Sequence, residues 1–102
     1  MPSGDIYVQI TATSEASEKS RSVVVLVPRE NIDNFRKQKT NRISDDHAIA
    51  LSLAEPLARY AFTHRTIFSE IEISHSFSNT APTEIEGRSP NLSQSGLKAW
   101  AI

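Results

Sequence analysis

Apolar and polar residues alternate near the start of the chain. From position 6 to position 12, every second residue is apolar. This period of two predicts a strand with one buried face. Residues 22–27 form an almost continuous apolar run rich in valine, which predicts a central strand covered on both faces. Pro28 ends that strand, and we expect the two strands to form an antiparallel hairpin joined by a polar loop over residues 13–21.

A polar segment follows the second strand. Its apolar residues up to position 41 are Ile32 and Phe35, whose spacing of three suits one or two helical turns. We therefore predict a short helix over residues 31–39.

The next helix has a clearer start. Ser44 or Asp45 can accept hydrogen bonds from the first backbone amides, and acidic residues favour this end of a helix. The stripe expected to be buried consists of Ile49, Leu53, Leu57 and Tyr60. Pro56 lies within the stripe and lacks a backbone donor, so we predict a kink or a break near Leu53.

Residues 66–78 show the longest alternation in the chain and predict a third strand with Glu70 and Glu72 on a wet face. His75 falls on the opposite, inner face, either as a core histidine or as a pH-sensitive interface group. A long strand at the edge of a small sheet is a natural site for pairing with another chain. Pairing about a two-fold axis would double the sheet.

The order β-β-α-α-β predicts an α+β domain over residues 1–78, with an antiparallel sheet of about three strands and helices on one face. Residues 79–96 lack periodicity, and the last six residues turn apolar. We expect residues 79–102 to form an extended C-terminal arm that docks on its own domain or on a neighbouring subunit. The expected protein-binding anchors are Leu97, Trp100 and Ile102, since tryptophan is enriched at interaction hot spots.

Composition narrows the protein class. The chain has 102 residues, a formal net charge of −1 and no cysteine. These values exclude a disulfide framework, a thiolate nucleophile and a cysteine metal site. No apolar run approaches the ~20 residues of a membrane span, and the N-terminus does not read as a secretory signal. We therefore expect a cytoplasmic or virion protein, and its small size is consistent with a phage or mobile-element origin.

One basic segment is a candidate nucleic-acid interface. It contains Arg36, Lys37, Lys39 and Arg42. Clustered cations contact phosphates, and such binding depends steeply on salt. The alternative is a solvated helix end, where cations suit the negative end of the helix dipole. No aromatic residue follows Phe35 within the segment to stack on bases.

Residues that carry catalytic or metal chemistry do not fall into a recognisable pattern. Asp45, Asp46 and His47 are adjacent, and helix capping explains both aspartates better than a metal site, which needs ligands on one face. Glu70 and Glu72 fit a solvated strand face better than a catalytic pair. We expect no enzyme activity, catalytic residue, metal or cofactor. Residues 85–88, Ile-Glu-Gly-Arg, resemble the recognition sequence of the protease factor Xa, which we interpret as coincidence.

The leading hypothesis is a non-enzymatic interaction or structural subunit of a homo-oligomer or larger assembly, with contacts through the third strand and the C-terminal arm. One alternative is a small nucleic-acid-binding regulator that uses the basic segment. Another is an inhibitor that presents the acidic face of Glu70 and Glu72 to a basic partner, with fast, salt-sensitive association.

Overall fold

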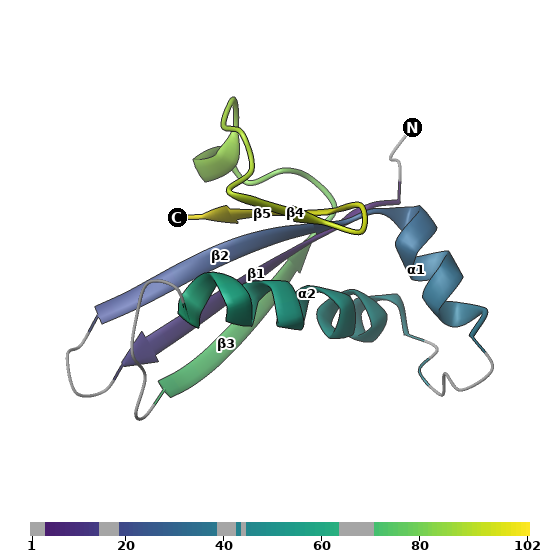
Figure 1. Ribbon diagram of the computed structural model, residues 1–102, viewed down its shortest axis with the longest axis horizontal. Helices are drawn as coiled ribbons and strands as arrows, with labels where there is room; N and C mark the ends of the chain where they lie inside the picture. The colour runs from purple at the N-terminus through teal and green to yellow at the C-terminus, as the bar shows by residue number, and fades with distance from the viewer. Residues whose placement is uncertain (1–3, 15–18, 39–42, 44, 64–70) are drawn as a thin grey trace.

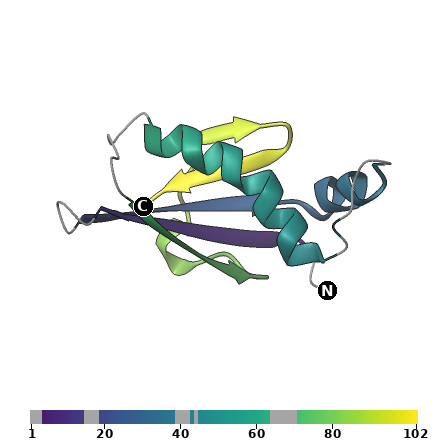
Figure 2. The same cartoon turned by 90° about the horizontal axis from the view of Figure 1, so that it is seen from below.

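The computed structural model describes residues 4–14, 19–38, 43, 45–63 and 71–102. They form an α+β fold in which one antiparallel sheet of five strands, in the order β3-β1-β2-β5-β4, carries two helices on one face (Figures 1 and 2). The elements are β1 (Ile6–Ser14), β2 (Lys19–Val27), α1 (Arg29–Arg36), α2 (Asp46–Thr63), β3 (Ile71–Ser78), the 3-10 turn η1 (Thr83–Ile85), β4 (Leu92–Gln94) and β5 (Leu97–Ala101).

The β1–β2 hairpin is longer than the sequence predicts. Its ladder runs from the pair Ile6–Val27 to the pair Ser14–Lys19, so most of the loop predicted over residues 13–21 is strand. Backbone hydrogen bonds do not require apolar side chains, and the polar residues at this end continue the ladder beyond the core.

The main core lies between the sheet and the helices. The strands contribute every second side chain, those on the sheet face that packs against α2. Each helix contributes the side chains of one face. Its fully enclosed members include Val8, Val25, Val27, Ile32 and Ile49. The central strand β2 is buried on both faces, as its valine run predicts, because Val24 packs on the side away from the helices.

Helix α2 excludes one of the two outcomes expected near Leu53 and differs from expectation at Tyr60. The break does not occur, because one helix continues through Pro56, which lies on the exposed side, where a missing backbone donor leaves no buried acceptor without a partner. Tyr60, predicted to be buried, is 54% exposed, because Ala54 and Ala58 complete the buried stripe instead. Alanine lets the helix approach the sheet closely.

Both helices begin next to an aspartate. The Oδ2 atom of Asp45 accepts a hydrogen bond of 3.1 Å from the backbone of Ala48, which confirms the predicted cap of α2. Helix α1 starts directly after Pro28, two residues earlier than predicted, and the Oδ1 atom of Asp5 accepts a hydrogen bond of 2.8 Å from its first amide, Arg29.

The C-terminal segment supplies the two strands that the sequence prediction of about three strands omits. A two-residue turn, Ser95–Gly96, joins β4 to β5 with positive φ angles of 54° and 88°. Such angles characterise the tight hairpin turns whose twist matches that of the strands. The side chain of Asn31 in α1 donates to the carbonyl oxygen of Ser95 at 2.8 Å. Residues 79–102 thus contribute to the same sheet as residues 1–78.

A second, smaller core lies on the sheet face away from the helices. It consists of Val24, Ile85 and Trp100, with Tyr7 and Leu26 packed against it. The segment around η1 lies on this face, on the opposite side of the sheet from α2 (Figure 2). Among the described residues, no helix is long and apolar enough to cross a membrane.

Candidate functional site: the edge strand β3

Strand β3 forms one border of the sheet. It pairs with β1 along its whole length, from Ile71 opposite Ser14 to Ser78 opposite Tyr7. Within the described parts of the chain, no strand pairs with its other side. Sheet edges are usually protected by lysine, proline, a bulge or a covering segment, and β3 contains neither lysine nor proline. Its outer backbone groups are therefore suited to pairing with a further strand.

An aromatic contact holds the end of β3 to the helix layer. The rings of His47 in α2 and Phe77 in β3 stack with centroids 4.7 Å apart, and His75 meets the same phenyl ring edge-on at 5.5 Å. Phe77 is half-buried, whereas both histidines are exposed. The register places His75 beside Ile10 on the helix side of the sheet, as predicted, but α2 packs mainly over β1, β2 and β5 and leaves this side chain uncovered.

The opposite face of β3 is polar. Ser74 and Ser76 are exposed and pair with Thr11 and Gln9 of β1. The hydroxyl group of Thr11 shares a hydrogen bond of 2.9 Å with that of Ser22 on β2. The edge strand therefore combines a hydroxyl-rich face with a partly aromatic face, and neither carries a dense charge.

The acidic face predicted for the third strand is only partly described. Glu72 pairs with Thr13 in the β1–β3 ladder, in line with Ser74 and Ser76. Glu70 lies outside the described residues, as do residues 66–69 of the predicted strand. The acidic inhibitor surface stays a prediction.

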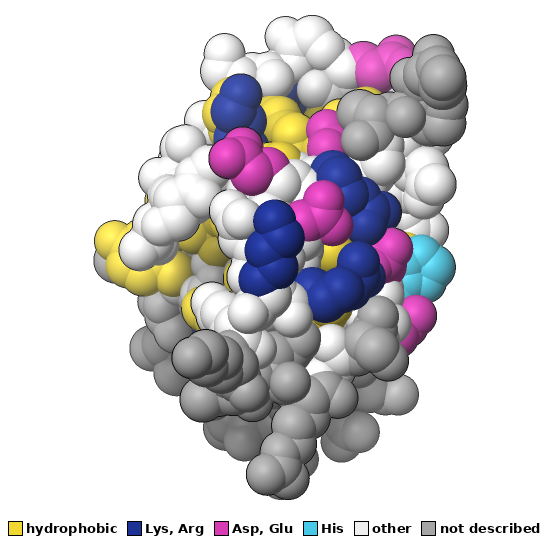
Figure 3. All heavy atoms as spheres, turned by 90° about the vertical axis from the view of Figure 1, so that its right-hand side faces the viewer, with side chains coloured by type: hydrophobic (Ala, Val, Ile, Leu, Met, Phe, Trp, Pro, Cys, Tyr) yellow, Lys and Arg dark blue, Asp and Glu magenta, His cyan; other side chains and the backbone are white. Residues whose placement is uncertain are grey.

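The two described residues of the basic segment lie in different surroundings, and its other two residues lie outside the described residues. Arg36, in the last turn of α1, forms ion pairs with Asp33 at 3.7 Å and with the buried Oδ1 atom of Asp46. Lys37 is exposed directly after the helix. Lys39 and Arg42 lie outside the described residues. On the side of the molecule that carries α1, cationic and anionic side chains interleave (Figure 3), which lowers the potential available to attract phosphates.

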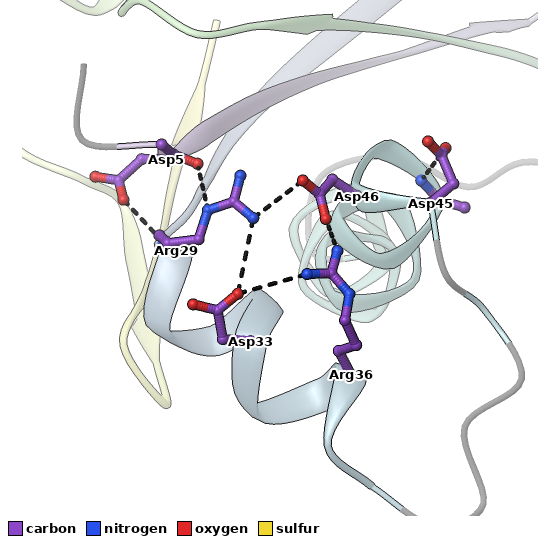
Figure 4. Close-up of polar contacts among 8 residues, drawn as sticks. Asp5, Arg29, Asp33, Arg36, Asp45 and Asp46 are labelled. Carbon is purple, nitrogen blue, oxygen red and sulfur yellow. Dashed lines mark hydrogen bonds and ion pairs between the residues drawn. The ribbon is translucent and has the colours of Figure 1, made fainter. Parts of the chain in front are cut away.

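These ion pairs belong to a network that joins α1, α2 and the segment just before β1 (Figure 4). Arg29 binds Asp46 of α2 at 3.0 Å, lies 3.8 Å from Asp33, and donates from Nε to the carbonyl oxygen of Gly4 at 3.1 Å. Asp46 therefore receives two guanidinium groups from α1. The network fixes the start of α2 against α1 and against Gly4, which lies just before β1, and this structural role occupies the charges nearest to the basic segment.

Two of the predicted C-terminal anchors are buried inside the chain. Leu97 belongs to the main core, and Trp100 belongs to the smaller core, where its Nε1 atom donates to the carbonyl oxygen of Arg88 at 2.9 Å. Ile102 remains 43% exposed, and its amide donates to Ser22. Docking on the same domain, one of the two arrangements expected for this segment, is the one observed.

A groove of about 190 Å³ lies between α2 and the β4–β5 hairpin. Its lining residues are Leu53, Pro56, Leu57, Gln94, Ser95 and Leu97. None of these side chains ionises, and the volume is below the roughly 300 Å³ of a small-molecule site. Within the described residues, no group of three or more histidine, aspartate or glutamate side chains gathers where it could hold a metal ion.

Sequence reasoning identified the third strand as an edge but assigned its contacts to the glutamates. The exposed residues Ser74, His75 and Ser76 were not singled out together, although their alternation with Phe77 was the available signal. Comparisons of this chain with protein-family models, curated proteins and solved structures find no match.

Proposed function

We propose that this protein is a non-enzymatic interaction subunit that builds a homo-oligomer by strand addition at β3. The observation that carries the proposal is the length of this edge, which spans Ile71–Ser78 and has one side without a strand partner among the described residues. Added strands gain main-chain hydrogen bonds along the edge, while alternate side chains provide specificity.

The opposite border of the sheet supports this choice. Strand β4 comprises only Leu92–Gln94, and very short edge strands are a common protection against unwanted pairing. The asymmetry between the two borders favours one productive edge, at β3. Because Leu97 and Trp100 are already buried, the proposal places the interaction on β3 rather than on the C-terminal segment.

A charged variant of the edge tests the proposal. In Ser74→Lys/Ser76→Lys, two exposed hydroxyls become cations that should repel an approaching copy while leaving the core intact. Sedimentation velocity over a concentration series should give more than one chain for the unmodified protein and a single chain for the variant. Ser52→Lys, on the exposed side of α2, is the control and should assemble normally. A single-chain mass for the unmodified protein at every concentration would overturn the proposal.

A further inference from the structure

We infer that the occupant of the β3 edge is the β3 strand of a second copy, paired antiparallel about a two-fold axis that passes beside His75. This inference rests on the proposed function and adds the partner strand and its register. The two sheets would then be continuous, with the helices of both copies on the same side.

Symmetry restricts the possible registers. Residues directly opposite each other in an antiparallel pair point to the same face, and successive residues alternate between the faces. In a pair of identical strands related by a two-fold axis, the axis must therefore pass beside a residue and not between two residues. For β3, axes at Ser74 and at His75 give the longest overlap, because both lie near the middle of Ile71–Ser78.

The pattern of side chains favours the axis at His75. With this axis, Ser74 comes opposite Ser76 of the second copy, and Ile73 comes opposite Phe77. Hydroxyl pairs and pairs of aromatic with β-branched residues are among the stabilising cross-strand combinations. An axis at Ser74 would instead place Ile73 opposite His75 and would leave Phe77 at the end of the overlap. Since Phe77 is only half-buried by its own chain, the first register covers more of it.

The charges on β3 and the position of α2 are also compatible with pairing between two copies of β3. The sequence of β3, IEISHSFS, has Glu72 as its one acidic residue, and in the proposed register this residue comes opposite Ser78 rather than another carboxylate. Each chain carries a formal net charge of −1, so repulsion between whole copies is small. Among the described residues, helix α2 packs mainly over β1, β2 and β5, and His75 on the helix side of β3 is exposed.

Single-cysteine variants of the full chain test the register, because the natural sequence contains no cysteine. Residues facing each other in an antiparallel pair have Cα atoms about 4.5–5.5 Å apart, within disulfide reach. His75→Cys should therefore link to itself under mild oxidation. Ser74→Cys and Ser76→Cys should each stay unlinked alone but link to each other when mixed. Neighbouring pairs alternate between the two spacings, so at least one of these links has the closer geometry.

Each outcome of this experiment has a distinct meaning. Linking of His75→Cys to itself, or of Ser74→Cys to Ser76→Cys only when mixed, supports the inferred register. Self-linking of Ser74→Cys would overturn the register and leave the strand addition intact. If no variant links while sedimentation still shows an oligomer, assembly uses another surface and the inference fails. If no variant links and the protein is a single chain, the proposed function fails as well. Ser52→Cys on α2 controls for links made by random collision.

Discussion

The imidazole ring of His47 lies flat against the phenyl ring of Phe77, with ring centroids 4.7 Å apart and planes inclined by 7°. His47 belongs to the first turn of α2, and Phe77 lies near the end of β3. Because α2 packs mainly over the other strands, this stack is a principal link between the helix layer and the edge strand. It positions the strand on which the proposed assembly depends.

Removing the imidazole tests that link. His47→Ala should lower the free energy of unfolding by about 0.5–1.5 kcal/mol, the contribution of an aromatic pair beyond its buried area. Urea denaturation measures this change. In hydrogen exchange, the substitution should accelerate the amides of β3 by a larger factor than it accelerates those of β2. Ser52→Ala, on the exposed side of the same helix, should change stability by less than about 0.5 kcal/mol. Equal unfolding midpoints for the two variants would contradict the assigned role.

The parts of the fold that follow from burial could be predicted from the sequence. Alternation in β1, the valine run in β2 and the cap at Asp45 each reflect a local physical requirement, and the structure contains all three. The ends of the elements were harder to place, since the ladder continues through polar residues to Ser14 and Lys19. Periodicity reports which side chains are buried and gives little information on where backbone pairing stops.

The C-terminal hairpin shows a second reason for failure. Leu97 and Ala99 face the main core while Trp100 faces the smaller core, so apart from Lys98 the end of the chain is apolar on both faces and lacks a clear alternation. The Ser95–Gly96 turn was a usable signal, but β4 is too short to show a period of its own. Strand order was beyond the sequence, because nothing local specifies that β5 adds beside β2 and leaves β3 at the border.

Two glycines provide a matched test of the contact between α1 and the β4–β5 turn. Gly87 and Gly96 have φ angles of 74° and 88°, so alanine at either position incurs similar backbone strain, about 1 kcal/mol. A Cβ atom at Gly96 would lie 3.2 Å from the Oδ1 atom of Asn31, while nothing lies within 4 Å at Gly87. Gly96→Ala should therefore be the more destabilising by about 1 kcal/mol, since it also disturbs the Asn31 hydrogen bond. In an Asn31→Ala background, the difference in stability between the two glycine variants should become smaller, and thermal unfolding measures this difference.

The factor Xa-like tetrapeptide reports on the packing of η1. Ile85 is buried, and the carbonyl oxygen of Arg88 accepts the indole hydrogen bond of Trp100, so the segment is held against the sheet. The native protein should be cut after Arg88 much more slowly than a free peptide of the same sequence, because cleavage requires local opening. Trp100→Phe keeps an aromatic ring but removes the indole donor to Arg88. Because one hydrogen bond contributes ~1 kcal/mol, cleavage should become about fivefold faster. Cutting of the native chain at the rate of the peptide would show that η1 is not held.

Substitutions at Arg36 and Lys37 can distinguish a structural role of the basic segment from nucleic-acid binding. Arg36 neutralises the buried Oδ1 atom of Asp46, whereas Lys37 is exposed at the end of α1 (Figure 4). Arg36→Gln should lower stability by about 1 kcal/mol in urea denaturation, less at high salt, and Lys37→Gln should have almost no effect. If the basic segment instead binds nucleic acid, each substitution should reduce the slope of log affinity against log salt by about one. Equal losses of affinity in the two variants, with unchanged stability in both, would favour the nucleic-acid interface over the ion-pair role of Arg36.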